Sequence, residues 1–478
     1  MELSERNLLL DHTSTKNSNN KLSVIFAIVC IVDVFGVFPV ITLPKAIIDS
    51  GFYGGIIICI VCSIQIYTAI LLGKSWIIAE KIDMSVKTKN RYPYSALAEI
   101  TYGTTFSNFV SFLVNVTIFG GGIPNLIVAS QNIELLGLRL SSGTFDVSFC
   151  YWIIIIGMIL CPVLWLGSPK DMKLLCTISV ANVVIVFLLV TGCLLFSTRA
   201  SSNSSDNTFQ PEQSFWELIF ICYGIISFQF DIHPSILTIQ VDMKEKSKLN
   251  SAVLGGFTIS LGMFFVVTAI AASKYGLSVK PSLLETLPTT IPLHFAALFV
   301  ALQLCLSSAV SNSALYQYME DCMSIPRAFN HRRCVLRTTL TFLAVLIAES
   351  VPRFDLVMSL IGGTLTGPLI FIFPPLFYLR MLSMEDKHMK QVAMETFTSI
   401  VYNTEEEINT ILTSRDLSQF ESRSVLGAKL DVYCCVTIIA FSTICTLVTT
   451  YVNIKNAIAF ANFSQPCIFN VSSALISL

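Results

Sequence analysis

The sequence is poor in charged residues. Only 13% of its 478 residues are Asp, Glu, Lys or Arg, which is about half the share found in an average soluble domain. Hydrophobic residues make up 54% of the chain, and its mean hydropathy is +0.71. This composition excludes an ordinary water-soluble protein and favours a single membrane-embedded helical bundle.

The sequence also lacks the signatures of several functional classes. Its net charge of −1 shows no basic or acidic bias, so no nucleic-acid partner is expected. It contains no nucleophile paired with a base, no metal-ligand cluster and no phosphate-binding loop, so we do not expect an enzyme. Most of the 15 cysteines fall in apolar runs, as Cys59 and Cys62 do. Cysteine behaves there as a small hydrophobe, so neither a disulfide framework nor a bound metal is expected.

Long apolar runs recur along nearly the whole chain. A membrane-spanning helix needs roughly 20 mostly apolar residues, and eleven segments fit: 23–47, 53–80, 107–136, 149–167, 172–196, 215–240, 251–273, 292–317, 335–350, 355–380 and 430–452. The segment 335–350 is the weakest, so ten or twelve spans remain open. We expect an all-α polytopic membrane protein with three parts: a cytoplasmic tail (1–22), a transmembrane domain (23–452) with an outer loop (197–214) and a cytoplasmic connector (381–429), and a C-terminal tail (453–478).

The distribution of basic residues predicts the orientation. If the N-terminus is cytoplasmic, 23 of the 30 Lys and Arg residues lie on the inner side, as the positive-inside rule requires. An odd number of spans then places the C-terminus outside, in the extracellular space or a lumen. The N-glycosylation candidates Asn203, Asn462 and Asn470 all fall on that outer side. The segment Glu5–Leu10 resembles an acidic dileucine sorting signal, so endolysosomal or vesicular membranes and the plasma membrane both remain open.

Two of the predicted spans are interrupted by glycine and proline, each at the start of a five-helix half. The first interruption is Asp33–Pro39 and the second is Phe228–Pro234. Transporters built from inverted repeats bind substrate near the bilayer midplane between such discontinuous helices. Exposed backbone groups there suit a zwitterionic amino acid and a small cation. We therefore expect substrate contacts at Phe35, Gly36, Val37, Phe38, Phe228 and Phe230. The alternative is a pair of ordinary proline kinks.

Ionisable side chains also occur inside these two spans. A carboxylate in an apolar span is costly and marks a substrate or ion path by default, and an imidazole changes charge near neutral pH. We expect the coupling-ion site among these residues and two hydroxyls of the eighth span: Asp33, Asp231, His233, Ser307 and Ser308. The alternatives are that Asp33 caps broken backbone, that His233 packs, and that the serines serve helix packing. No cofactor is expected beyond H⁺ or Na⁺ as the coupling ion.

Five motifs follow one another along the chain: Leu43-Pro44-Lys45-Ala46, Tyr94-Ser95 with Tyr102-Gly103, Phe228–His233 with Met243, Leu360–Gly363, and Phe373-Pro374-Pro375. In sequence and order they resemble the amino acid/auxin permease family, which contains the proton-coupled and vesicular inhibitory amino acid transporters. The resemblance implies a LeuT-type five-plus-five inverted repeat with an eleventh helix.

The same resemblance implies a function. It would be secondary active amino acid transport, coupled to H⁺ or Na⁺ by alternating access. The chain departs from the family pattern at Val37, Pro39, Ile232 and Pro234. A non-transporting amino acid sensor with the same fold is therefore the alternative. The expected partners are a small amino acid substrate and the lipid bilayer, and the sequence leaves the oligomeric state open.

Overall fold

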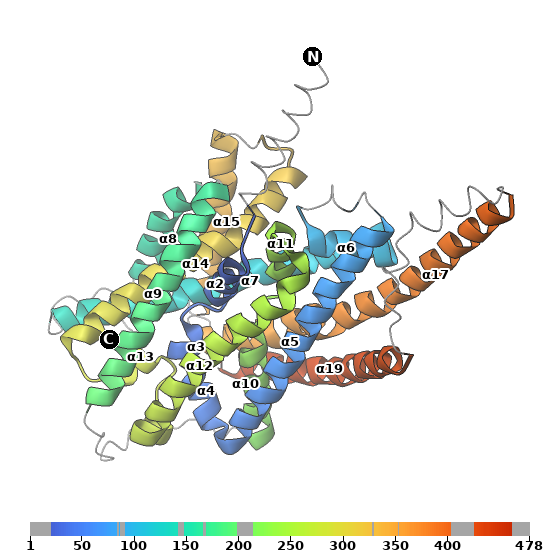
Figure 1. Ribbon diagram of the computed structural model, residues 1–478. Coiled ribbons are helices and arrows are strands. Elements are labelled where there is room, and N and C mark those ends of the chain that lie inside the picture. The colour runs from blue at the N-terminus through green and yellow to red at the C-terminus, as the bar shows by residue number, and fades with distance from the viewer. Residues whose placement is uncertain are drawn as a thin grey trace.

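The protein is almost entirely helical in its computed structural model. The structure describes residues 21–83, 86, 91–141, 148–165, 169–197, 214–326, 329–351, 353–402 and 425–460. Within these ranges, β-structure is limited to one isolated bridge between Leu22 and Met243. Helices occupy each of the eleven predicted segments (Figure 1). The glycosylation candidates Asn203, Asn462 and Asn470 and the dileucine segment lie outside the described residues.

The first half of the bundle runs from α2 to α9. Its main helices are α2 (Val24–Phe35), α3 (Phe38–Ile41), α4 (Leu43–Asp49), α5 (Gly51–Ile82), α7 (Thr104–Leu140), α8 (Phe149–Trp165) and α9 (Pro169–Phe196). The short α6 (Pro93–Tyr102) lies between α5 and α7. The first predicted span is therefore interrupted, and the next four are continuous.

The second half repeats this order. It contains α10 (Phe215–Gln229), α11 (His233–Asp242), η2 (Lys246–Lys248), α12 (Leu249–Tyr275), η3 (Gly276–Ser278), α13 (Leu283–Thr286), α14 (Ile291–Cys322), α15 (His331–Ser350), α16 (Phe354–Ile361), the π-helical turns η4 (Gly362–Thr366) and η5 (Pro368–Ile372), and α17 (Phe373–Tyr402). An additional helix, α19 (Val425–Phe460), follows. Each half thus opens with an interrupted span, as the five-plus-five prediction requires.

Hydropathy alone identifies most, but not all, of these spans. Eight helical stretches in the described part are long and apolar enough to cross a membrane, and α2 and α8 are shorter apolar helices. The remaining span, α15, carries Arg333 and Arg337, whose Nε atoms lie 3.1 Å and 2.7 Å from Glu320 Oε1 of α14. Because these charges are paired inside the bundle, α15 packs there despite its polarity.

The helix of the tenth predicted span continues into the predicted connector. The predicted connector begins at residue 381, but α17 runs on to Tyr402 and projects from the bundle (Figure 1). Residues 381–402 contain no glycine or proline, so nothing in the local sequence ends the helix. The first part of the connector is therefore helical, and residues 403–424 lie outside the described ranges.

Thirteen of the cysteines in the described ranges are free thiols. Cys150, at the start of α8, is disulfide-bonded. One bond therefore does form, and it involves a cysteine at the end of a span rather than within one.

Close backbone packing fixes the position of α10. A Cβ atom added to Gly362 would collide with the carbonyl oxygen of Gly224, and one added to Gly224 would lie 2.7 Å from the carbonyl oxygen of Ser359. The two glycines therefore let α10 lie directly against the backbone of α16 and η4.

Candidate functional site

The first interruption follows α2. Gly36, which follows the last residue of this helix, has φ 61° and ψ −148°, a backbone region that is open almost only to glycine. The chain resumes with α3, which carries Pro39 in its first turn, and then with α4, which carries Pro44 in its first turn. Proline is tolerated there because the first-turn N–H groups have no helical partner. The predicted break is confirmed at Gly36.

The second interruption separates α10 from α11. The connecting residues are Phe230, Asp231 and Ile232. The N–H of His233 donates to Asp231 Oδ1 at 3.1 Å, so the carboxylate caps the start of α11, and Pro234 occupies its first turn. This predicted break is confirmed as well.

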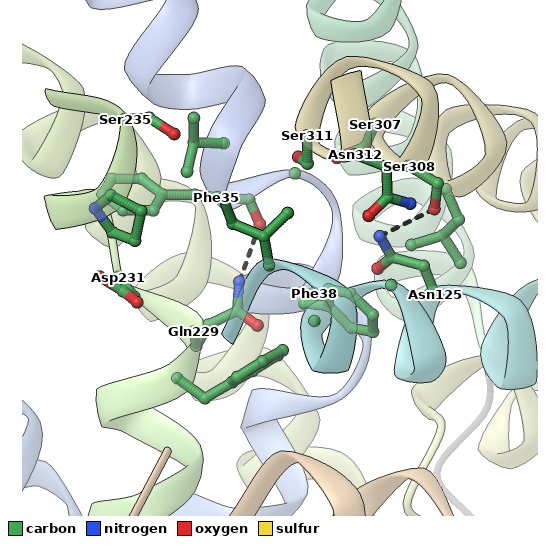
Figure 2. A pocket seen from close by; sticks show the side chains of 18 of the residues that line it. Phe35, Phe38, Asn125, Gln229, Asp231, Ser235, Ser307, Ser308, Ser311 and Asn312 are labelled. Atoms are coloured by element: carbon green, nitrogen blue, oxygen red, sulfur yellow. Dashed lines mark hydrogen bonds between the residues drawn. The ribbon is translucent and has the colours of Figure 1, made fainter. Parts of the chain in front are cut away.

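The two interruptions meet at a cavity of about 110 Å³, together with α7 and α14. Figure 2 shows Asp231 and Ser235 at one end, the side chains of Asn125, Ser308 and Asn312 at the other, and Gln229 and Phe38 between them. The lining residues are Val34, Phe35, Gly36, Phe38, Thr117, Ile118, Gly121, Gly122, Asn125, Phe228, Gln229, Asp231, Pro234, Ser235, Gln303, Leu304, Ser307, Ser308, Ser311 and Asn312.

Seven of the eleven residues predicted from the sequence line this cavity. They are Phe35, Gly36, Phe38, Phe228, Asp231, Ser307 and Ser308. The described lining does not include the other four, which are Val37, Phe230, Asp33 and His233. The structure therefore brings most of the predicted set together and locates the rest behind the cavity wall.

Phe230 belongs to an aromatic cluster rather than to the wall. Its ring centroid lies 5.0 Å from that of Phe35 and 5.8 Å from that of Phe257 of α12, and the rings of Phe35 and Phe257 are 4.9 Å apart. Phe230 is fully buried. Such contacts stabilise a packed aromatic group, so Phe230 supports Phe35 from behind. Val37 is fully buried too.

Asp33 faces α9 instead of the cavity. Its carboxyl group interacts with Ser179 and Cys176 of that helix, and its side chain is almost fully buried. Oδ1 has no hydrogen-bond partner among the described residues. Ser179 Oγ is also 3.4 Å from Nε2 of Gln303, which lines the cavity. A polar path therefore connects Asp33 with the cavity.

His233 lies behind Asp231. Its ring is fully buried, with Nε2 3.0 Å from Thr68 Oγ1 of α5 and Nδ1 3.7 Å from Asp231 Oδ1. Tyr94 of α6 is also near Asp231 and donates its hydroxyl to the carbonyl of Leu369 at 2.7 Å. The imidazole is thus held between α5 and the carboxylate at the end of the cavity.

The sequence analysis missed the amide side chains of the site. Asn125 Nδ2 donates to Ser308 Oγ at 3.0 Å and so links α7 to α14. Gln229 Nε2 donates to the carbonyl of Phe35 at 2.8 Å. Asn312 and Gln303 line the cavity as well. A buried amide in an apolar span is unfavourable without a partner, so the argument applied to Asp33 and Asp231 would also have identified these residues.

Known proteins resemble the chain in sequence. The family model "Transmembrane amino acid transporter protein" matches residues 21–404. Amino acid transporter AVT1D of Arabidopsis thaliana is 26% identical over 356 residues, which cover 72% of this chain and 60% of that protein. The vesicular inhibitory amino acid transporter of Homo sapiens is 24% identical over 367 residues, covering 72% and 66%. The matched part of the chain spans about three fifths of the length of the first curated relatives.

A solved structure shares the architecture. The crystal structure of MhsT in complex with L-phenylalanine aligns with a TM-score of 0.54 at 10% identity, covering 90% of this chain and 98% of that one. This similarity confirms the predicted LeuT-type fold. The matching family and both relatives are described as transporters, which agrees with the prediction that the chain is not an enzyme.

Proposed function

The chain belongs to the transmembrane amino acid transporter family, and on that premise we propose that it is a secondary active transporter of amino acids. The observation that carries this proposal is the cavity between the two interrupted spans. Half-helix ends beside such a cavity suit a zwitterion, whose opposite charges need both donors and acceptors.

The lining favours small neutral amino acids as substrates. Its described residues include one ionisable side chain, Asp231, whereas the remaining polar side chains are amides and hydroxyls. An anionic substrate side chain buried there would find no partner of opposite charge among the described lining residues. The rings of Phe35, Phe38 and Phe228 restrict the space further, and a cavity of about 110 Å³ suits a short side chain.

The location of the cavity supports alternating access. With the N-terminus inside, the cavity extends from the breaks toward the cytoplasmic ends of α7 and α14, where Thr117 and Asn312 line it. On the opposite side Val37 and Ile41 are buried, and α13 packs against α3. We assign this arrangement to an inward-directed state. Transport would then require the broken helices to rock against α7 and α14.

The coupling ion, H⁺ or Na⁺, would act through the ionisable residues near the breaks. Asp33 offers a buried carboxylate oxygen without a partner in the described part of the chain. Asp231 lines the cavity, with His233 directly behind it, and Ser307 and Ser308 lie across from it on α14. Protonation or cation binding at these groups would change the charge next to the substrate. Movement of the ion across the membrane would thereby be coupled to movement of the amino acid.

Uptake into proteoliposomes tests the proposal. The purified protein is supplied with labelled glycine, L-alanine, L-serine, L-glutamate and L-lysine under an imposed pH gradient or sodium gradient, which is then collapsed. We expect concentrative uptake of neutral amino acids that depends on one gradient. Binding without flux under either gradient would instead support the sensor, and absence of both binding and flux would contradict an amino acid site altogether.

A further inference from the structure

Gln229 connects the two interrupted spans directly. It is the last residue of α10, and its Nε2 donates to the carbonyl of Phe35, the last residue of α2, at 2.8 Å. Carbonyl groups at the end of a helix lack helical partners and carry the negative end of its dipole. A single side chain therefore satisfies the end of α2 from the other half of the protein.

The second polar atom of the same amide, Oε1, has no hydrogen-bond partner in the described structure. Gln229 itself is 4% exposed and lines the cavity. Figure 2 shows Nε2 directed at Phe35 and Oε1 on the side of Phe38. A buried acceptor without a partner is unfavourable. A residue of the cavity wall thus holds an unsatisfied acceptor just beneath the surface, which a ligand in the cavity could satisfy after a small movement of the amide.

An amino acid carries the matching donor. Its α-ammonium group has three N–H donors, and burying it requires nearby acceptors. The Phe35 carbonyl already accepts one hydrogen bond from Gln229, and Asp231 Oδ1 accepts one from the His233 N–H, whereas Gln229 Oε1 accepts none in the described structure. Gln229 Oε1 lies on the same side chain that holds α2, so a ligand bound to it would act on both interrupted spans.

We propose that Gln229 Oε1 accepts a hydrogen bond from the α-ammonium group of the bound amino acid, while Nε2 of the same amide transmits occupancy of the cavity to α2. This inference rests on the proposed function. It assigns substrate recognition and the connection between the two breaks to one residue, with the two atoms of its amide doing separate tasks.

The recognition task is tested with Q229L and pairs of ligands that differ only in the ammonium group. The probes are glycine, L-alanine and L-serine, each compared with its des-amino acid: acetate, propionate and 3-hydroxypropionate. Equilibrium binding is measured on the purified full chain. We expect Q229L to weaken binding of the three amino acids about 10- to 100-fold, the effect of losing a hydrogen bond to a charged group. Binding of the des-amino acids should change less than about threefold.

The connecting task is tested with Q229E. Glutamate keeps an acceptor of the same length but replaces the donor to the Phe35 carbonyl with a carboxylate oxygen, which that carbonyl repels. We expect amino acid binding within about threefold of the wild type and an uptake rate more than tenfold lower. A purely structural role would lower binding and uptake together in both variants.

Gln240 supplies the matched control. Its Nε2 donates to the carbonyl of Gly73 at 3.1 Å, so it too links two helices, and it is fully buried. Its Oε1 also lacks a partner within the described ranges, but the residue is not part of the cavity lining. We expect Q240L to alter thermal stability while leaving the preference for amino acids over des-amino acids unchanged.

The outcomes separate the inference from the proposed function. Two outcomes, with a wild type that binds the amino acids, would show that Gln229 does not recognise the ammonium group. In one, Q229L binds the amino acids as tightly as the wild type does; in the other, its affinity for amino acids and des-amino acids falls to the same extent. If the wild type binds none of the three amino acids, the proposed function fails and this inference fails with it.

Discussion

The two interrupted spans satisfy their broken backbone in different ways. At the second break, Asp231 caps the N–H of His233 only two residues away, so the cap is local in sequence. At the first break, the carbonyl of Phe35 is satisfied by Gln229, which lies 194 residues further along the chain. The second break is therefore largely self-contained, whereas the first depends on the fold around it.

This difference separates two properties that substitutions can test. The second break contributes the charge in the cavity, through Asp231. The first contributes an unusual backbone conformation at Gly36 and a carbonyl that needs a distant donor. Substitutions are expected to have the largest effect at the second break, which carries Asp231, and a smaller effect at the first break, which contains Gly36. The smallest effect is expected at α13, which packs beyond the first break.

The largest effect is expected from D231N. The Oδ1 atom of asparagine can accept the same hydrogen bond from the His233 N–H, so α11 should still form, but the cavity loses the ionisable side chain of Asp231. We expect gradient-driven uptake to fall more than tenfold with little change in melting temperature. D231A should in addition lose the cap and about 1 kcal/mol of stability. Wild-type concentrative uptake by D231N would show that the charge at the second break is dispensable.

The next effect is expected from G36A at the first break. A Cβ atom there would meet Gln303 Nε2 at 2.9 Å, and the backbone has φ 61°. Adopting this conformation costs a non-glycine residue about 1–3 kcal/mol, so thermal unfolding in detergent should occur at a lower temperature. Gly51 has φ 58° but open space at its Cβ position. The G51A variant therefore measures the cost of backbone strain without a steric collision. If G36A and G51A lower the unfolding temperature equally, the contact with Gln303 has no role in the effect.

A moderate effect is expected from N125A at the neutral end of the cavity. This substitution removes the hydrogen bond to Ser308 and should raise the KM for neutral amino acids about 3- to 10-fold, the effect of one neutral hydrogen bond. Uptake by N125A should depend on the ion gradient as uptake by the wild type does, in contrast to uptake by D231N. A KM unchanged across the amino acid panel would show that this end of the cavity does not contact substrate.

The smallest effect is expected from E285Q on α13, which packs against α3 beyond the first break. Burial raises the pKa of Glu285 above its ordinary value, and Lys280 and Arg139 partly oppose this shift. The packing of α13 is therefore most stable below the ordinary pKa of glutamate. It weakens as the pH rises through the raised pKa of Glu285 in the folded protein. The opening free energy of α13, measured by hydrogen exchange and corrected for the intrinsic exchange rate at each pH, should therefore fall as pH rises in the wild type. E285Q should remove this slope, and a slope that persists in E285Q would implicate another group.

Much of the fold could be predicted from the sequence because membrane spans are local features. Apolar length identified a helix for each span, and glycine and proline marked both interruptions, at Gly36 and Pro234. Local rules left the segment 335–350 as the weakest predicted span, because its place in the bundle depends on a partner. The polar helix α15 packs in the bundle because Glu320 pairs with its arginines, and hydropathy cannot register a pair of residues on two helices.

The site shows the same division. The sequence indicated which segments would form it, and Phe35, Phe38 and Asp231 do line the cavity. It could not indicate which way a side chain points once helices pack. Phe230 turns to Phe257, and Asp33 turns to α9. The contribution of Gln229 was also hidden, because its partner belongs to the other half of the chain.

The sequence by itself determined that this protein is a helical membrane bundle with two broken spans, because apolar length and helix-breaking residues act over a few turns of chain. The tertiary structure alone decided which side chains face the cavity and how the first break is satisfied. The physical reason is that a buried polar group must find its partner in space, and that partner can come from any helix packed beside it.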